Sequence, residues 1–207
     1  MTLPAWVLDD EPKPAPEPLL LVQSFVNTLE VGQQTDLLAD PGTATPWLRL
    51  AGLLGPEATA SAEELRSARE FREGLRALLV RNGGGAAPAA SDMRPLETAV
   101  RSARLRLAVA DDGEVQLDAG PPGRVADGLL GLLLIIRDAQ RDGTWRRLKV
   151  CANDECRWAF YDRSHSRRGA WCDMATCGNL IKNRNLRARQ GGRTAGRRAG
   201  PGRTART

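Results

Sequence analysis

The sequence has no apolar run long enough to cross a membrane. Its longest one, Leu129–Ile136 (LLGLLLII), has eight residues, whereas a bilayer-spanning helix needs about 20. The opening residues 1–18 (MTLPAWVLDDEPKPAPEP) lack the basic start and apolar core of an export signal, and their acidic, proline-rich composition predicts a disordered leader. We therefore expect a cytoplasmic protein without a membrane partner.

Catalytic motifs are also scarce. The glycine-rich stretch NGGGAAP at 82–88 lacks the Lys-Ser/Thr pair and the strand–turn–helix context of a phosphate-binding loop, and no nucleophile motif is present. His165 is the only histidine. It can act as a metal ligand or a general base, but we expect an exposed loop residue. We accordingly expect that the protein is not an enzyme.

Charge is distributed unevenly along the 207 residues. Residues 1–140 carry 13 Lys+Arg against 20 Asp+Glu, a net charge of −7, whereas residues 141–207 carry 17 against 5, a net charge of +12. So basic a segment is typical of a surface that contacts a polyanion. The length and the 42% hydrophobic content allow one ordinary domain and a small accessory one.

The acidic part has mainly helical patterns. The stretch SAEE at 61–64 is a capping box and predicts a helix that ends near Arg81. Further helices are expected from about Asp92 to Arg101 and over 125–140, which is apolar nearly all round and so predicts the central buried helix. Residues 19–30 fit a helix or a strand equally well.

One β-hairpin is predicted between these helices. Segments 105–110 and 114–119 flank Asp-Asp-Gly, a turn sequence that favours a hairpin. The expected fold class of residues 19–142 is therefore mainly α with a β-hairpin (α+β).

All four cysteines lie in the basic part, in the pattern C-x4-C-x15-C-x4-C: Cys151, Cys156, Cys172 and Cys177. In a reducing compartment, cysteines at short spacing are more often metal ligands or catalytic groups than disulfides. Four thiolates suit tetrahedral Zn²⁺ and leave no coordination position open. We predict one structural zinc ion; the alternative is four free, buried cysteines.

The spacing also predicts a small treble-clef-like finger over residues 143–190. RWAFYDRS at 157–164 alternates as the first strand of a hairpin between the two cysteine pairs. Asn179 is a good N-cap for a basic helix over Leu180–Gln190, in which leucine and isoleucine side chains can face the metal. Residues 191–207 are rich in glycine and arginine and are expected to be disordered.

A metal-anchored basic helix that continues into a polybasic tail predicts contact with nucleic acid, duplex DNA in the first place. The alternative is a solvated basic face. Arginine and lysine can contact phosphates, and asparagine can read base edges. The candidate residues are Arg157, Arg163, Arg167, Arg168, Lys182, Asn183, Arg184, Asn185, Arg187 and Arg189.

Two other functions stay open. Trp158, Tyr161 or Trp171 can stack on unpaired bases, as in an RNA- or ribosome-associated binder. Alternatively, the finger is a protein-interaction or dimerisation module attached to a small-molecule-binding domain or an enzyme, and a homo-oligomer is compatible with either function.

Residues 144–179 (TWRRLKVCANDECRWAFYDRSHSRRGAWCDMATCGN) resemble the CGNR zinc finger. SFVNTLE at 24–30, PWLRLAGLL at 46–54 and ELRSAREFREGLRALL at 64–79 resemble the ABATE domain, typically found N-terminal to that finger. The resemblance implies a bacterial, stress-induced transcription regulator, in which the finger binds DNA and residues 19–142 form a regulatory domain that senses a signal.

The resemblance also assigns residues. It implies zinc ligation by the same four cysteines and places the Gly and Asn of the family motif at Gly178 and Asn179. The sequence departs at the next position, where Leu180 stands in place of the motif arginine, and Lys182 and Arg184 can compensate.

Two polar residues, Asn27 and Thr28, follow Phe25 and Val26 in the sequence FVNT. They are candidates for binding a small ligand. The alternative is an ordinary helix cap or a buried hydrogen bond.

Overall fold

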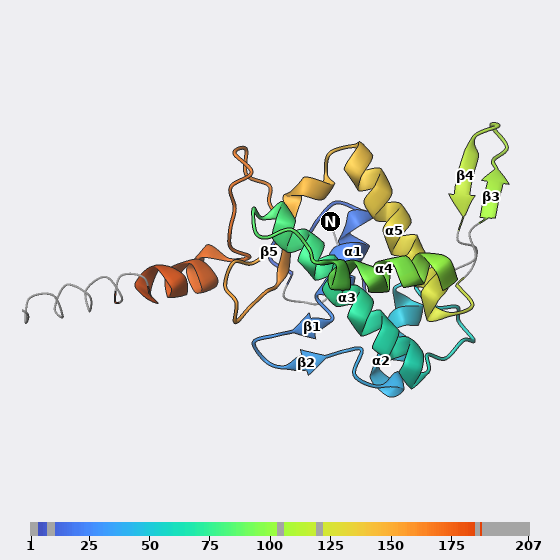
Figure 1. Ribbon diagram of the computed structural model, residues 1–207, viewed down its shortest axis with the longest axis horizontal. Coiled ribbons are helices and arrows are strands. Elements are labelled where there is room, and N and C mark those ends of the chain that lie inside the picture. Colours follow the sequence, from blue (N-terminus) through green and yellow to red (C-terminus); the bar gives the residue numbers. More distant parts are fainter. Residues whose placement is uncertain (1–3, 8–10, 103–105, 119–121, 185–186, 188–207) are drawn as a thin grey trace, which may run out of the picture. The chain divides into compact units, whose positions relative to one another are not determined.

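The computed structural model describes residues 4–7, 11–102, 106–118, 122–184 and 187. The chain divides into two compact units, residues 1–172 and residues 173–207. The helices of the first unit are α1 (Leu19–Val26), α2 (Pro41–Leu50), α3 (Ala62–Asn82), α4 (Ala90–Ser102), α5 (Val125–Arg141) and the short 3-10 helix η1 (Trp145–Arg147), most of them visible in Figure 1.

The described strands form antiparallel two-stranded pairs. They are β1 (Leu29–Glu30) with β2 (Thr35–Asp36), β3 (Arg106–Val109) with β4 (Val115–Asp118), and β5 (Leu148–Val150) with β6 (Ala159–Tyr161). Helices thus dominate and the strands are short, which confirms the predicted α+β fold class. No helix within the described residues combines the length and the apolar character that a membrane crossing requires.

Helix α3 lies at the centre of the first unit and begins at the predicted capping box. The Ser61 hydroxyl accepts from the Glu64 backbone N–H (3.2 Å), and the Glu64 carboxylate accepts from the Ser61 backbone N–H (3.0 Å). These two bonds satisfy backbone donors that have no partner within a helix. The helix ends at Asn82, one residue beyond the prediction, and packs against α1, α2, α4, α5 and β5.

Two other sequence-based expectations need adjustment. Residues 19–30 do not form one element, because α1 ends at Val26 and β1 begins at Leu29. Helix α5 is buried along one face rather than all round. That face packs on α1, α3 and α4, whereas Leu133, Leu134 and Ile135 are only half-buried at the surface. An apolar composition therefore overstated the burial of this helix.

The predicted hairpin is confirmed. Strands β3 and β4 pair with Leu107 opposite Leu117, and Gly113 adopts φ +84° in the connecting turn.

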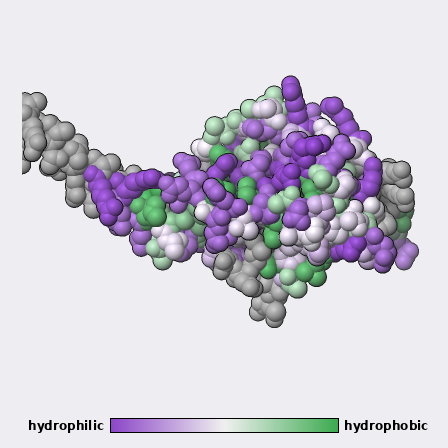
Figure 2. Space-filling view, turned by 90° about the horizontal axis from the view of Figure 1, so that it is seen from below, coloured by the Kyte–Doolittle hydropathy of each residue, from purple (hydrophilic) through white to green (hydrophobic). Residues whose placement is uncertain are grey.

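In the view of Figure 2, hydrophilic residues cover most of the surface and hydrophobic ones form small separate patches.

The prediction of a disordered leader is wrong for residues 11–18. Glu11 and Ala15 are buried in the first unit. The Gln23 side chain accepts from the Ala15 backbone N–H (2.7 Å), and the Tyr161 backbone N–H donates to the Lys13 carbonyl (2.9 Å). Hydrogen bonds to residues outside the segment thus hold the backbone of this proline-rich stretch in place. Residues 1–3 and 8–10 of the leader, like residues 191–207 of the predicted tail, lie outside the described residues.

Burial of Glu11 predicts a pH-dependent stability. Burial raises the pKa of this carboxyl to about 7, although Asn27 donates a 2.8 Å hydrogen bond to it. Because the pKa of Glu11 is higher in the folded than in the unfolded protein, its contribution to the free energy of unfolding is fully present below pH about 4.5. This contribution is lost as the pH rises through about 7, which lowers the free energy of unfolding by about 3 kcal/mol in total. In Glu11→Gln this loss should disappear, as measured by denaturant unfolding at pH 5.5 and 8. Equal pH dependence in both proteins would contradict the assignment.

The hydrophobic core does not end at the expected domain boundary near residue 143. Leu148 and Ala159, on β5 and β6, are fully buried in the same cluster as Phe25 of α1 and Leu75 of α3. Helix α3 packs on β5, and α1 packs on β6. The first half of the predicted finger is therefore part of the N-terminal core.

Candidate metal centre and basic surface

The four cysteines converge as the sequence spacing predicts. The Sγ atoms of Cys151, Cys156, Cys172 and Cys177 all lie within 4.8 Å of one another, and those of Cys156 and Cys172 are 3.6 Å apart. A tetrahedral ion with Zn–S bonds of about 2.3 Å requires sulfur atoms about 3.8 Å apart. The number, type and separation of the donors therefore fit one structural zinc ion.

The first cysteine pair occupies the turn of the β5–β6 hairpin. The Cys151 backbone N–H donates to the Trp158 carbonyl (2.9 Å), and the Asn153 carbonyl accepts from Cys156 (2.9 Å) and Arg157 (3.0 Å). Arg157 has φ +52°, a left-handed conformation that closes the turn before β6 begins. This compact loop brings both thiols to the same end of the hairpin.

This arrangement corrects the expected position of the hairpin. RWAFYDRS does contain a strand, β6, but its partner is the preceding β5, with Val150 opposite Ala159. The hairpin therefore surrounds the first cysteine pair and does not lie between the two pairs. Sequence alternation identifies a strand but not its partner, because the partner is set by long-range packing, here of β5 on α3.

In the second unit, a helix begins earlier than predicted. The Asp173 carboxylate accepts from the Ala175 (3.0 Å) and Thr176 (3.2 Å) backbone N–H groups and caps the π-helical turn η2 (Met174–Gly178). Helical structure continues to residue 184, and Asn179 has helical φ and ψ angles of −68° and −39°. Asp173, not Asn179, is thus the N-cap, so Cys177 lies on the first turns of the helix.

Leu180, which replaces the motif arginine, was expected to face the metal together with its apolar neighbours. Its side chain is 49% exposed, whereas Ile181 is half-buried. The position can therefore carry a solvent-facing side chain.

The thiols of Cys151, Cys156 and Cys172 affect one another's ionisation. Hydrogen bonds from Cys156 and Cys172 lower the pKa of Cys151, whereas the Cys151 sulfur raises the pKa of Cys156 and of Cys172. Ionisation of Cys151 is therefore favoured, and ionisation of Cys156 and Cys172 beside it is opposed. A divalent cation removes this opposition because it neutralises the accumulated negative charge.

A buried ion pair fixes the base of the loop that follows β6. Lys149 and Asp162, with side chains 5% and 4% exposed, form a 2.8 Å ion pair. Burial raises the pKa of Asp162, but hydrogen bonds from Lys149 and from the Ser164 and Gly169 backbone outweigh it and lower the pKa below its ordinary value. A Cβ atom at Gly169 would lie 2.8 Å from the Asp162 carboxyl carbon, so glycine allows this close approach.

The residues between these anchors, 163–168, form what we call the arginine loop. Arg163, Arg167 and Arg168 are exposed there, as is His165, which is not among the clustered metal donors. The loop carries no acidic side chain. It therefore presents positive charge from a fixed base.

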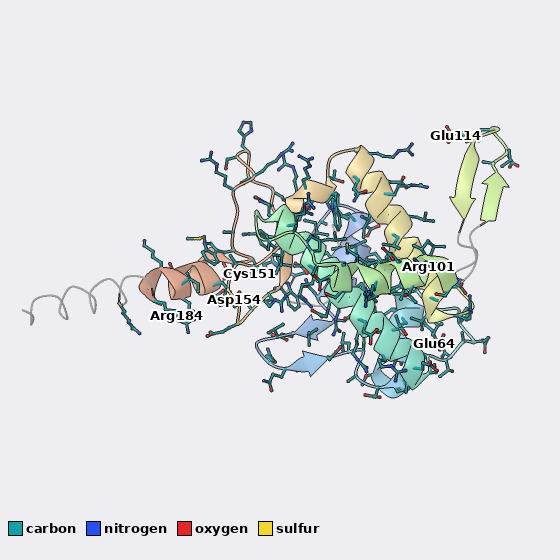
Figure 3. All side chains as sticks on the ribbon, viewed as in Figure 1. Glu64, Arg101, Glu114, Cys151, Asp154 and Arg184 are labelled. Carbon is teal, nitrogen blue, oxygen red and sulfur yellow. The ribbon has the colours of Figure 1, made fainter. Side chains whose placement is uncertain are left out.

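The remaining nucleic-acid candidates are distributed as follows. Lys182, Asn183, Arg184 and Arg187 are exposed in the second unit, where Arg184 is labelled in Figure 3. Arg157 is half-buried and its carbonyl is engaged by Arg76. Asn185 and Arg189 lie outside the described residues. Of the stacking candidates, Trp158 and Tyr161 are buried and Trp171 is half-buried.

Asn27 and Thr28 take part in buried hydrogen bonds. The Asn27 amide accepts from the Ala159 backbone N–H (2.7 Å) and donates to the Ala159 carbonyl (3.0 Å). The Thr28 hydroxyl donates to the Phe25 carbonyl (2.8 Å) and accepts from Arg72 (3.1 Å). Both residues are buried. Their hydrogen bonds join α1 to β6 and to α3 and so match the alternative, a buried hydrogen bond.

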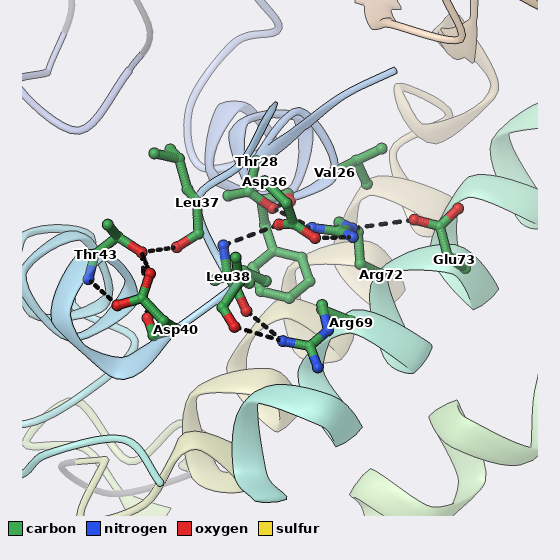
Figure 4. A network of polar contacts seen from close by, with 12 residues as sticks. Val26, Thr28, Asp36, Leu37, Leu38, Asp40, Thr43, Arg69, Arg72 and Glu73 are labelled. Carbon is green, nitrogen blue, oxygen red and sulfur yellow. Dashed lines mark hydrogen bonds and ion pairs between the residues drawn. The ribbon is translucent and has the colours of Figure 1, made fainter. Parts of the chain in front are cut away.

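Two buried arginines on α3, Arg72 and Arg76, were not predicted from the sequence. Arg72 makes bidentate hydrogen bonds to Asp36 (2.6 and 2.9 Å) in the network of Figure 4, and Arg76, one turn later, is 0% exposed. Burial alone raises the pKa of Asp36, but Arg72 outweighs it and lowers the pKa. Their four-residue spacing along the apolar face of the helix was the available signal.

A groove of about 530 Å³ lies between α3, α4 and the beginning of α5. Its floor is apolar, with Pro95, Ala99 and Leu129, and its rim carries the hydroxyl of Thr98 and the carboxylate of Glu70. Glu64, also in the lining, accepts from the Val125 backbone N–H (3.3 Å). None of the predicted site residues lines this groove.

A helical domain whose core includes the hairpin that carries the first cysteine pair of a four-cysteine metal centre defines a zinc-finger protein with an integrated N-terminal domain. The CGNR zinc finger family model matches residues 147–190. The ABATE model, described as "putative stress-induced transcription regulator", matches residues 20–142, more than half of the chain. The protein therefore belongs to the ABATE family and carries a C-terminal CGNR zinc finger. A search of curated proteins gave no match.

Proposed function

We propose that the protein is a DNA-binding transcription regulator and that the arginine loop contacts the phosphate backbone. The observation that carries this proposal is the exposure of Arg163, Arg167 and Arg168 above the buried Lys149–Asp162 pair. The Asp162 carboxylate pairs with Lys149 below the surface. It therefore does not neutralise the positive charge of the arginines on the loop. Arginine is suited to phosphate because its planar guanidinium can donate two parallel N–H hydrogen bonds to phosphate oxygens.

Duplex DNA is favoured over single-stranded RNA because of where the aromatic side chains lie. Trp158 and Tyr161 are each only 8% exposed, which removes two of the three stacking platforms that unpaired bases need. In direct competition, excess duplex DNA should displace labelled single-stranded RNA, whereas preferential retention of the RNA would reverse this choice.

The double variant Arg167→Ala/Arg168→Ala should weaken duplex binding at low salt. It should also reduce the slope of log affinity against log salt by about 0.9 for each phosphate that the variant no longer neutralises. Fluorescence anisotropy at several salt concentrations measures both quantities. The matched control is Arg66→Ala/Arg101→Ala, which removes two exposed charges from α3 and α4 (side chains 61% and 78% exposed). Equal effects of the two double variants would indicate net charge alone and count against the loop.

The ABATE part of the proposal is that this domain senses a small ligand, and the groove between α3, α4 and α5 supports it. The groove combines an apolar floor with hydroxyl and carboxylate groups, as ligand sites commonly do. Thr98→Trp fills the groove from an exposed position. If the groove controls the finger, this change should alter DNA affinity and leave zinc content unchanged; unchanged affinity, with or without cell extract, would argue against sensing there.

A further inference from the structure

Arg76 is the largest fully buried side chain among the described residues and is not explained by the N-terminal core alone. It is 0% exposed, and burial lowers the pKa of its guanidinium. Burying a charged group is costly unless its donors are satisfied. The function of Arg76 is therefore to be found in its hydrogen-bond partners.

These partners lie on both sides of the sequence boundary between the ABATE domain and the finger. Nη2 donates to the Val26 carbonyl at the end of α1 (2.8 Å), and Nε donates to the Glu73 carboxylate (3.0 Å). Nη1 donates to the carbonyl of Arg157 (2.6 Å). A single guanidinium thus joins α3 and α1 to the residue that directly follows Cys156.

The Arg157 carbonyl occupies a sensitive position in the metal-binding turn. Arg157 is left-handed at φ +52°, and its backbone N–H donates to the Asn153 carbonyl that also accepts from Cys156. A non-glycine residue keeps this conformation only where its surroundings hold it. Arg76 supplies a charged donor to this peptide group, so it restrains the end of the turn on which Cys156 is placed.

Helix α3 also restrains the other end of the same hairpin. The Asn82 amide donates to the carbonyls of Trp145 (2.9 Å), in η1, and Leu148 (3.0 Å), the first residue of the strand that leads to Cys151. One helix of the ABATE domain thus holds both the start of β5 and the end of the metal-binding turn.

We propose that Arg76 is a positioning residue for the metal centre. Through the Arg157 carbonyl it places Cys156 for ligation, and it thereby couples the packing of the ABATE core to the zinc affinity of the finger. Such coupling is reciprocal, so zinc also stabilises the packing around α3. The inference rests on the zinc centre and does not depend on DNA binding.

Arg72 provides a matched control. It lies one turn earlier on the same helix, is 2% exposed and also contacts Glu73, but its other partners are Asp36 and Thr28, which belong to the N-terminal core. No hydrogen bond from Arg72 to the finger is found among the described residues. Removing either guanidinium should destabilise the core, whereas only removal of the Arg76 guanidinium should lower the zinc affinity of the metal centre.

The experiment compares full-length Arg76→Met and Arg72→Met. Zinc affinity is measured by competition with a chromophoric chelator, and ligand geometry by the absorption spectrum of the Co²⁺-substituted protein. Arg76→Met should lower zinc affinity about 10- to 100-fold, the usual cost of losing a group that orients a metal ligand, and should alter the Co²⁺ spectrum. Arg72→Met should reduce thermal stability and leave affinity and spectrum close to those of the parent protein.

A milder variant covers the case in which Arg76→Met does not fold. Arg76→Lys keeps the charge but replaces the planar fork by a single ammonium, so it should fold with a smaller but measurable loss of zinc affinity. Parent-like zinc affinity in a folded Arg76 variant would overturn the proposal. So would an equal loss in the Arg72 and Arg76 variants, because that result would show general destabilisation and no specific action on Cys156.

Discussion

Full-length protein carrying Cys177→Ser is expected to lose its zinc, whereas the parent protein should contain about one zinc ion per chain. The Sγ atoms of all four cysteines lie within 4.8 Å of one another. Removal of one thiolate therefore leaves an incomplete tetrahedral set. Structural zinc contributes about 10 to 16 kcal/mol of apparent binding free energy in small zinc-finger peptides, so the effect should be large. Elemental analysis of protein purified under reducing conditions measures it.

The control for this prediction is His165→Ala. His165 is the only histidine in the sequence, and it is exposed on the arginine loop outside the cysteine cluster. This variant should retain its full zinc content. Zinc retained by Cys177→Ser, or lost by His165→Ala, would show that the ligand set differs from the four thiolates. The helices of the N-terminal core should persist in both variants because their packing does not use the thiols.

Leu148→Ala is expected to destabilise the N-terminal core, although residue 148 belongs to the matched zinc-finger segment. Its side chain is 0% exposed and lies in the same cluster as Phe25 and Leu75. Truncating a buried leucine costs about 2 to 5 kcal/mol, from lost burial and from the cavity left behind. Denaturant unfolding followed by helical circular dichroism should show one transition at a lower midpoint.

Val109→Ala supplies the comparison for this second prediction. Val109 is 71% exposed at the end of β3, so the free energy of unfolding should change by less than about 0.5 kcal/mol. A separate, early transition in Leu148→Ala, with the helical transition unchanged, would mean that β5 and β6 form an independent module. The shared core predicts the opposite result.

The predictions for Cys177→Ser and Leu148→Ala together distinguish a zinc finger that folds independently from one that shares the N-terminal core. In an independent finger, the metal is the main source of folding free energy, as expected for small domains with few core residues. In this protein the β5–β6 hairpin is already buried against α1 and α3. The metal then adds to a partly assembled site, and residues of the ABATE domain influence how well that site is formed.

By itself the sequence determined the features that depend on neighbours within a few residues. The Ser61–Glu64 capping box, the Asp-Asp-Gly turn and the paired cysteines act over short separations, and the structure agrees with each of them. Their chemistry is local, so residue type and spacing are sufficient to predict them.

Only the tertiary structure decided which distant segments meet. It paired β6 with β5, buried Glu11 of the leader beside Asn27, and placed Arg76 against the Arg157 carbonyl. The physical reason is that a buried charge or an unpaired strand has many potential partners along the chain. Only the packing of the whole core selects one of them, because a buried polar group without a hydrogen bond costs free energy.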